Sequence, residues 1–452
     1  NYNVLVGDEA GTALTTGDNN VAIGFEALNS EDANGDNVAV GYRALKTLNA
    51  GADGFNTAVG YLAGTNMTTG LENAVYGSFA GDALTDADYN VALGGSALSN
   101  DTLGSQSTAV GFGALGGQNF TTATNTLNTG VGYLAGNDIT TGINNVIVGG
   151  LAGDALTDAD FNVALGTHAL TADTLGSKST ALGYFSLGNQ NFTTATDSFN
   201  TAVGYHAGLA VTTGIKNVIV GGQAADALTT GSYNVAIGDF ALSTDDVGSR
   251  SVAVGANALF AQNYATATDG YNVAVGMNAG LSVTTGIQNV LIGGLAGDAI
   301  TDADFNTAVG HGSLSQNVLG SKNTALGTFS LLNVNPATAA DTLNVGVGYG
   351  AGQNVTTGLN NTLIGSLSGD ALTSGNSNVA VGKDALGGDT LGGGSVAIGK
   401  DALKVQNFTT ATTNYNVAVG LEAGAAVTTG QQNTIVGGLA GDALTVGQNN
   451  VV

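Results

Sequence analysis

Three histidines, His168, His206 and His311, are the side chains of this sequence best suited to act as general bases near neutral pH. They stand at different places in the 72-residue block of the repeat described below, and none of them recurs in another block. The chain has no cysteine, so it lacks both thiol nucleophiles and clusters of Cys and His that would bind a metal. We therefore expect no enzymatic activity and no cofactor.

An aspartate-rich segment occurs three times and offers carboxylates to a hard cation. It occupies residues 82–88, 154–160 and 298–304, with aspartate at its first, fifth and seventh positions. Clustered carboxylates in a turn can bind Ca²⁺. However, the pattern is lost in the equivalent turns around Thr229 and Thr373, and the nine-residue repeat of calcium-binding rolls does not occur. Solvated turns are the favoured interpretation, and Ca²⁺ binding is the alternative.

Five segments that interrupt the repeat could contact a ligand, because four of them carry an aromatic residue between Asn and Thr or Ala. The aromatic residues are Phe120, Phe192, Tyr264 and Phe408, and Pro336 replaces the ring in the fifth segment. A ring flanked by such polar groups can stack on a sugar while they supply hydrogen bonds. In the alternative, which Pro336 favours, the ring folds back over the body of the chain or packs on a neighbouring chain.

These candidate residues are positioned by a short repeat that runs through the whole sequence. A motif such as Asn-Val-Ala-Ile-Gly at residues 20–24 ends in a glycine that recurs 25 times from Gly7 to Gly437, usually 17 residues apart. Spacings of 17, 17, 17 and 21 form a block of 72 residues, whose coils we name a to d, with Gly60 in coil a. Repeats this short bury their apolar faces by stacking on each other. The sequence predicts a parallel β-solenoid of about 25 coils in one continuous domain, residues 1–452.

Composition supports an all-β body and excludes several partners. Glycine accounts for 73 of 452 residues, 43% are hydrophobic, and no helical periodicity or membrane-length apolar stretch occurs. A net charge of −25 disfavours nucleic acid and anionic membranes as partners, and we expect no membrane insertion. Because the chain starts at Asn1 and stops at Val452 in mid-pattern, we expect it to be the ordered part of a longer fibre protein.

Positions counted from the motif glycine, taken as zero, predict a strand that is apolar on both faces. Position −4 is Asn or Ser, which we expect to form a hydrogen-bonded ladder, and positions −3 and −1 are almost always aliphatic or Thr. Position −2 is Ala or Gly in coils a, c and d but bulky in coil b. We expect positions −3 and −1 to fill the coil and position −2 to need a second surface. A row of harmless exposed alanines is the alternative. The predicted chain–chain interface consists of Val75, Ile147, Ile219, Leu291, Leu363 and Ile435.

The motif also resembles a known family. Residues 20–27, 107–114 and 234–241 each run from Asn or Ser through the strand and glycine to an alanine three positions later. This pattern resembles the head repeats of trimeric autotransporter adhesins. The Thr-Thr-Gly turns at 68–70, 140–142, 212–214 and 284–286 are similar to repeats of phage tail fibres. The resemblance covers the entire chain, although the family repeat is shorter and its anchoring parts have no counterpart here. It implies a left-handed parallel β-roll, with three chains side by side in an attachment fibre.

We therefore expect an extracellular structural fibre or adhesin, at a cell surface or on a virion tail. Its expected partners are copies of itself, as a homotrimer, and a cell-surface glycan or protein receptor. The alternative is an extracellular filament in which solenoid subunits join end to end through unpaired coil edges. An ice-binding solenoid fits least well, because paired threonines recur mainly in coils a and d.

Overall fold

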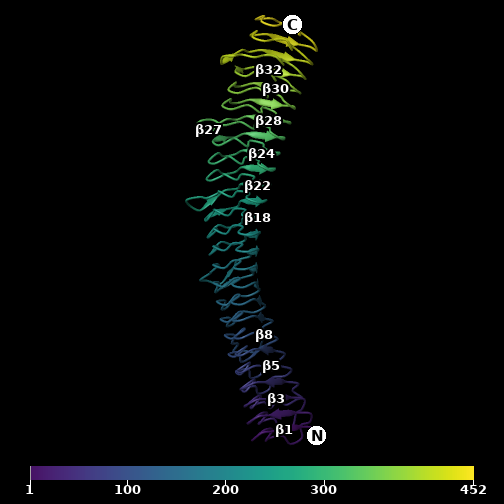
Figure 1. Cartoon of the computed structure of the whole chain (residues 1–452), viewed down its shortest axis with the longest axis vertical. Helices are drawn as coiled ribbons and strands as arrows, with labels where there is room; N and C mark the ends of the chain where they lie inside the picture. The colour runs from purple at the N-terminus through teal and green to yellow at the C-terminus, as the bar shows by residue number, and fades with distance from the viewer. Residues whose placement is uncertain (1) are drawn as a thin grey trace. The chain divides into compact units, whose positions relative to one another are not determined.

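A computed structural model describes residues 2–452, which form strands and turns without a helix. Contacts divide the chain into two compact units, Asn1–Thr230 and Gly231–Val452. In each unit, short parallel strands follow one another in chain order (Figure 1), one strand to a coil. Unit 1 holds 13 three-residue strands and unit 2 holds 12, which confirms the predicted β-solenoid of about 25 coils. That both units form one continuous domain stays a prediction.

The three-residue strands of unit 1 are β1 (Val4–Val6), β2 (Val21–Ile23), β3 (Val38–Val40), β4 (Thr57–Val59), β5 (Ala74–Tyr76), β6 (Val91–Leu93), β8 (Thr108–Val110), β10 (Thr129–Val131), β11 (Val146–Val148), β12 (Val163–Leu165), β14 (Thr180–Leu182), β16 (Thr201–Val203) and β17 (Val218–Val220). Those of unit 2 are β18 (Val235–Ile237), β20 (Val252–Val254), β22 (Val273–Val275), β23 (Val290–Ile292), β24 (Thr307–Val309), β26 (Thr324–Leu326), β28 (Val345–Val347), β29 (Thr362–Ile364), β30 (Val379–Val381), β32 (Val396–Ile398), β34 (Val417–Val419) and β35 (Thr434–Val436).

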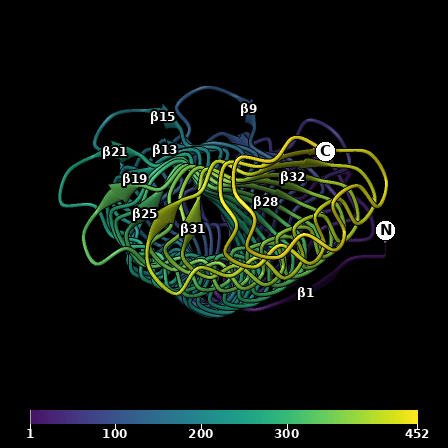
Figure 2. The same ribbon diagram turned by 90° about the horizontal axis from the view of Figure 1, so that it is seen from above.

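Five pairs of two-residue strands flank the 21-residue coils. They are β7 (Gly104–Ser105) with β9 (Thr124–Asn125), β13 (Gly176–Ser177) with β15 (Thr196–Asp197), β19 (Gly248–Ser249) with β21 (Thr268–Asp269), β25 (Gly320–Ser321) with β27 (Ala340–Asp341), and β31 (Gly392–Gly393) with β33 (Thr412–Thr413). Within unit 2, β19, β21, β25 and β31 lie on the same side of the coils (Figure 2).

The motif glycine sets the period because each one sits directly over the next. Gly166 has a φ of +133°, and a β-carbon on it would lie 2.5 Å from the carbonyl oxygen of Gly183 in the following coil. Such a contact is well inside van der Waals distance, and the positive φ adds strain for any L side chain. One glycine per coil is therefore a steric requirement of the stack.

The coil interior is narrow and takes position −2, not positions −3 and −1. Ala22 at position −2 and Ala27 at position +3 are both fully buried, whereas positions −3 and −1 are half-buried or exposed in every three-residue strand. The predicted interface residues Val75, Ile147, Ile219, Leu291, Leu363 and Ile435 all lie inside the chain's own coils, at most 1% exposed. The predicted interface is therefore wrong.

The bulky residues of coil b have a different reason. Apart from Ala225, coils a and b carry glycine at position +4, where coils c and d carry a buried leucine such as Leu187. A β-carbon on Gly208 would lie 2.8 Å from Ile219 Cδ1 and 3.1 Å from Leu187 Cδ2. The large side chain in coil b thus fills the volume that the glycines leave, as close packing of an interior requires.

The polar residues at position −4 form the predicted ladder. The backbone N–H of Asn162 donates to Oδ1 of Asn145, 2.9 Å away, and the side-chain Nδ2 of Asn145 donates to the Ala159 carbonyl at 2.8 Å. Both asparagines are buried, so each bond compensates a polar group that water does not reach. In four of the coils d, serine takes over the position, and the buried Ser179 hydroxyl lies 2.5 Å from that of Ser198.

Candidate functional site

The inserted aromatic residues are part of the interior and do not form a ligand-binding row. Phe120, Phe192, Tyr264 and Phe408 are only 4 to 6% exposed. The Tyr264 hydroxyl donates to the Gly286 carbonyl at 3.0 Å, so even this polar group is used within the chain. The prediction of ligand contact by these four rings is wrong, and the alternative in which the ring folds back over the solenoid is confirmed.

A buried carboxylate holds each aromatic segment in place. Asp173 is fully buried, and its Oδ1 accepts the backbone N–H groups of Gly176 at 3.0 Å and Phe192 at 3.2 Å. Its Oδ2 accepts Gln190 Nε2 at 2.5 Å. Asp245 and Asp389 are equivalent, and burial raises the pKa of all three carboxyls while the glutamine hydrogen bonds act in the opposite direction.

The fourth block replaces this arrangement as a unit. Asn317 stands where the other blocks have aspartate, and Val334 stands in place of glutamine. Asn317 Oδ1 accepts the Gly320 N–H at 2.8 Å, and its Nδ2 donates to the Gly320 carbonyl at 2.7 Å. Because both polar atoms of the neutral Asn317 amide are hydrogen-bonded to the Gly320 backbone, this side chain needs no hydrogen bond from a glutamine. The pair serves folding, and its chemistry does not point to catalysis.

The aspartates of the acidic segments bond neighbouring coils together. Asp158 accepts the Thr141 hydroxyl at 2.6 Å, and Asp160 accepts the Ile143 N–H at 2.7 Å; the segment around Asp302 repeats both contacts. Over residues 2–452, no three His, Cys, Asp or Glu side chains gather closely enough to hold a metal ion. Through these hydrogen bonds, the carboxylates connect the Thr-Thr-Gly turn of coil a to the turn of coil b.

The three histidines lie against aromatic rings, and His168 and His206 both pack on Tyr184 and Phe185. His168 stacks on Phe185 with ring centroids 4.5 Å apart, and His206 stacks on Tyr205 at 3.9 Å. His311 meets Phe329 edge to face at 5.5 Å. They belong to rows of rings that follow the motif glycines, and within residues 2–452 no hydroxyl or carboxylate is hydrogen-bonded to their imidazoles.

The outward face of the strands is the first candidate surface for an interaction. Positions −3 and −1 of the 25 strands carry Val, Thr, Ile and Leu, with one Ala and one Tyr, and no charged residue. Leu93, Leu165 and Leu326 are 44 to 47% exposed on this face. With strands about 4.8 Å apart, the face extends roughly 50 to 60 Å in each unit, with about 7 Å between its two rows.

The second surface is a row of side chains at position −5, just before the buried ladder. Large apolar residues in coils a and c alternate with polar or cationic ones in coils b and d. In unit 1 the row includes Phe55, Glu72, Tyr89, Gln106, Leu127, Asn144, Phe161, Lys178 and Phe199. In unit 2 it includes Tyr233, Arg250, Tyr271, Gln288, Phe305, Lys322, Leu343, Asn360, Ser377, Gly394, Tyr415 and Gln432. We call it the −5 row.

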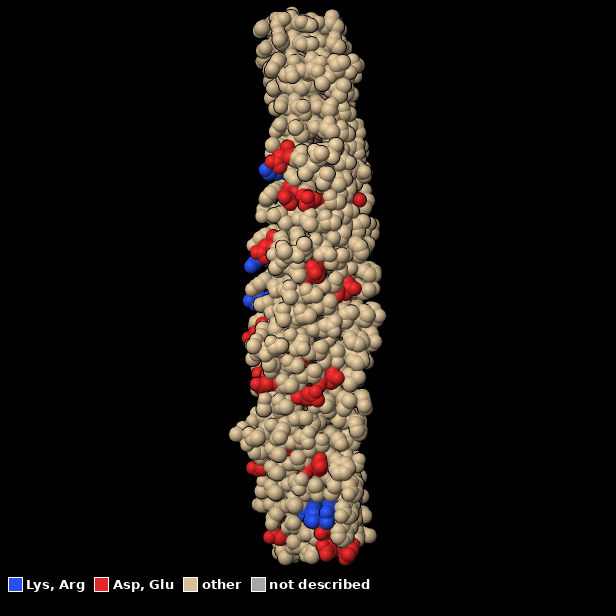
Figure 3. All heavy atoms as spheres, turned by 90° about the vertical axis from the view of Figure 1, so that its left-hand side faces the viewer, with Lys and Arg blue, Asp and Glu red and all other residues tan. Residues whose placement is uncertain are grey.

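Cations in the −5 row lie against neighbouring rings and pair with acids. The Arg250 guanidinium lies 5.0 Å from the centroid of Tyr233 and 5.8 Å from that of Tyr271, and its Nε is 3.0 Å from Asp269. Lys178 lies 5.2 Å from the Phe199 ring. On the face that Figure 3 displays, charged side chains are scattered among a majority of uncharged ones. The row is therefore amphipathic and largely self-neutralising.

Both surfaces escaped prediction for identifiable reasons. The larger side chains at positions −3 and −1 favoured these positions as the inward face, whereas the structure places them outward. The alternation of the −5 row is visible in the sequence, but its residues have a left-handed backbone that aromatic residues rarely adopt, such as Phe161 with a φ of +58°. No known family model matches the chain, and a search of curated proteins finds no relative. Among residues 2–452, no helix has the length and apolar character needed to cross a bilayer.

Proposed function

We propose that this chain is an extracellular structural fibre or adhesin whose copies associate side by side through the outward face of the strands. The observation that carries the proposal is the uncharged, half-exposed strand face of each unit. Exposed apolar patches on monomers rarely exceed a few hundred Å², and larger ones mark interaction sites. A flat face of regular spacing is also complementary to a copy of itself, because every coil offers the same two rows.

The absence of catalytic geometry at the histidines supports a structural role, and the motif's resemblance to adhesin and tail-fibre repeats supports an attachment fibre. In this proposal three copies surround a common axis, and the side chains at positions −3 and −1 face that axis. The buried coil b residues at position −2 take no part in the contact. Attachment would then use the surfaces that remain outside, including the −5 row.

Light scattering of the purified chain across a concentration series tests the association. We expect a constant mass near three chains. In a double variant, Leu93→Lys with Leu165→Lys, we expect the mass of one chain, because each lysine would have to be desolvated at the contact. The matched control is Tyr89→Lys with Phe161→Lys, which changes the −5 row of the same two coils and should leave the mass near three chains.

Three outcomes would contradict the proposal. One is a single-chain mass for the unmodified protein, and another is an unchanged mass for the strand-face variant. The third is a mass that grows steadily with concentration, which would favour the end-to-end filament instead.

A further inference from the structure

Between Phe55 and Gln432, the −5 row is interrupted in the fifth block, which lies in unit 2. In three blocks, coil c carries an aromatic residue and coil d a cation at this position: Phe161 with Lys178, Tyr233 with Arg250, and Phe305 with Lys322. The fifth block has Ser377 and Gly394 instead, so two large side chains are missing in succession. The next coil again carries a ring, Tyr415, which is 62% exposed.

The acid that partners the cation is missing as well. Lys178, Arg250 and Lys322 pair with Asp197, Asp269 and Asp341 at 2.5, 3.0 and 2.5 Å. The position of these aspartates is taken by Thr413 in the fifth block, and the serine before the cation is replaced by Gly393. The changes remove an entire ion pair together and leave a neutral environment.

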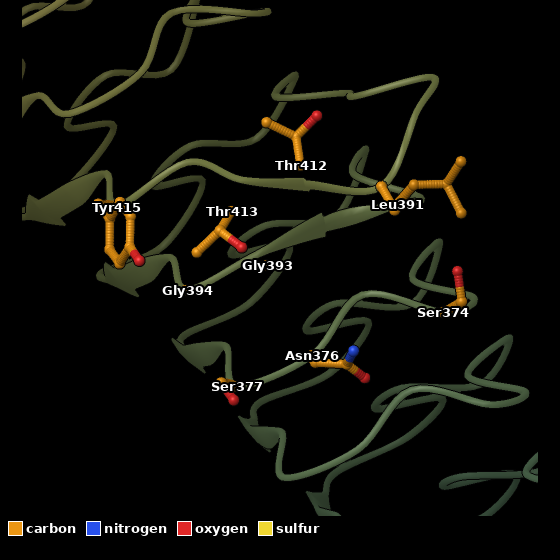
Figure 4. Close-up of a pocket in the computed structure, with 10 residues that line it drawn as sticks. Ser374, Asn376, Ser377, Leu391, Gly393, Gly394, Thr412, Thr413 and Tyr415 are labelled. Carbon is orange, nitrogen blue, oxygen red and sulfur yellow. The ribbon is translucent and has the colours of Figure 1, made fainter.

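A cavity of about 400 Å³ occupies the space that these side chains leave. It is lined by side chains and backbone of three successive coils, with Tyr415 and Thr413 from one, Gly394 from the second, and Ser377 and Asn376 from the third (Figure 4). A volume of this size is typical of small-molecule sites. None of the ten lining residues is charged.

The lining supplies both an apolar surface and hydrogen-bonding groups. The side of the Tyr415 ring that faces Gly394 has no cation against it, unlike the rings of Phe199 and Tyr271 in the equivalent coils. The Asn376 Oδ1 accepts the Leu359 N–H at 2.7 Å, which leaves the amide Nδ2 as a donor. Hydroxyls of Ser374, Ser377, Thr413 and Tyr415 complete the set.

We propose that this cavity binds a neutral carbohydrate unit, with one sugar face stacked on Tyr415 and sugar hydroxyls bonded to Asn376 and the surrounding hydroxyls. A sugar has both an apolar face and many hydroxyls, which matches a ring beside uncharged polar groups. A cationic ligand would need the carboxylate that accompanies each cation in the other blocks, and Thr413 provides none. The inference rests on the proposed attachment function, since it names the class of receptor that this surface contacts.

Saturation-transfer NMR with lactose, maltose and cellobiose as probes, and sialyllactose as a charged comparison, tests the proposal. We expect saturation of at least one neutral disaccharide by the unmodified chain. Gly394→Lys restores the cation found in the second, third and fourth blocks and fills the cavity, and Tyr415→Ala removes the ring. We expect each change to weaken binding about tenfold or more. Tyr271→Ala, the same change in the third block, should leave binding intact.

A lysine is compatible with the backbone at this position, because Lys178 and Lys322 adopt φ values of +61° and +63°, close to the +74° of Gly394. Circular dichroism of Gly394→Lys should therefore match that of the unmodified chain. The proposal is overturned if no neutral probe binds, if sialyllactose binds in preference to all of them, or if binding survives Gly394→Lys. Light scattering on the same samples separates the proposals: association without sugar binding overturns only this inference, and sugar binding by single chains overturns only the trimeric fibre.

Discussion

Replacing Gln190 by valine should leave the buried Asp173 carboxylate without its side-chain donor. Gln190 Nε2 lies 2.5 Å from Asp173 Oδ2 and 2.8 Å from the Ser179 hydroxyl, and its Oε1 accepts Asn200 Nδ2 at 2.8 Å. Three buried hydrogen bonds are lost, one of them to a charged group. At about 1 kcal/mol for each neutral bond and about 1.5 to 3 kcal/mol for the charged one, we expect the local free energy of opening to fall by about 3.5 to 5 kcal/mol.

Hydrogen exchange of the Gly176 and Phe192 amides measures this loss directly, because both donate to Asp173 Oδ1. A fall of this size should accelerate their exchange roughly 300-fold to 4,000-fold. The equivalent amides of Gly392 and Phe408, which bond to Asp389 three blocks later, provide an internal control and should exchange at their original rates.

Two further results would refute this reasoning. Adding Asp173→Asn to Gln190→Val recreates the Asn317 and Val334 combination of the fourth block, so most of the lost protection should return. Burial raises the pKa of Asp173, so the folded chain binds the carboxyl proton of Asp173 more tightly than the unfolded chain does. The free energy lost in Gln190→Val is therefore largest above the folded-state pKa of Asp173, where the carboxylate is charged. This loss shrinks as pH falls toward the ordinary carboxyl pKa of about 4. An unrescued loss, or an equal loss at pH 4 and pH 8, contradicts the assignment.

Three other changes test the fold. Gly166→Ala should cost several kcal/mol, seen as a lower melting temperature, whereas Gly150→Ala should change little because a β-carbon there meets nothing within 4 Å. Phe192→Ala should cost about 3 to 5 kcal/mol in urea unfolding, and the exposed Phe199→Ala under 1. Burial raises the pKa of Tyr264, so its stabilising contribution should fade as pH rises above its ordinary value of 10.0, and Tyr264→Phe should weaken this alkaline loss in thermal melts.

The period, the strand positions and the asparagine ladder could be predicted because each depends on one residue type with one steric or hydrogen-bonding role. A β-carbon at Gly166 has no room, and Asn145 satisfies two neighbouring coils, so neither position tolerates much variation. The inward face could not be predicted, since size normally indicates the interior. Here the opposed alanines at positions −2 and +3 set a narrow coil, and the larger Val, Ile and Leu residues at positions −3 and −1 lie outside.

The prediction of ligand-contact rings was wrong for a related reason. A motif shows which groups are present, but it does not show which of them already contact partners on the neighbouring coils. Phe120 and its counterparts suit a sugar by composition, yet a buried aspartate on the preceding coil draws each one inward. Tyr415 gives the opposite case. Its type is unremarkable within the −5 row, and it becomes a candidate only because two coils below it lack the side chains that cover the equivalent rings.

The buried polar layer also bears on why the blocks are 72 residues long. Coils of nearly identical strands could pair with the wrong neighbour, since a shift of one coil preserves the motif glycine and the asparagine ladder. We infer that the Asp173–Gln190 layer and its counterparts oppose such a shift, because it would place a buried carboxylate beside an aliphatic side chain such as Val211, with no donor. The fourth block lacks the charge, so its neighbours must hold it in register. Hydrogen exchange of the Gln190→Val variant distinguishes the two roles: local opening alone gives one exchange rate at each amide, whereas a lost register would give a mixture of rates that extends to the neighbouring coils.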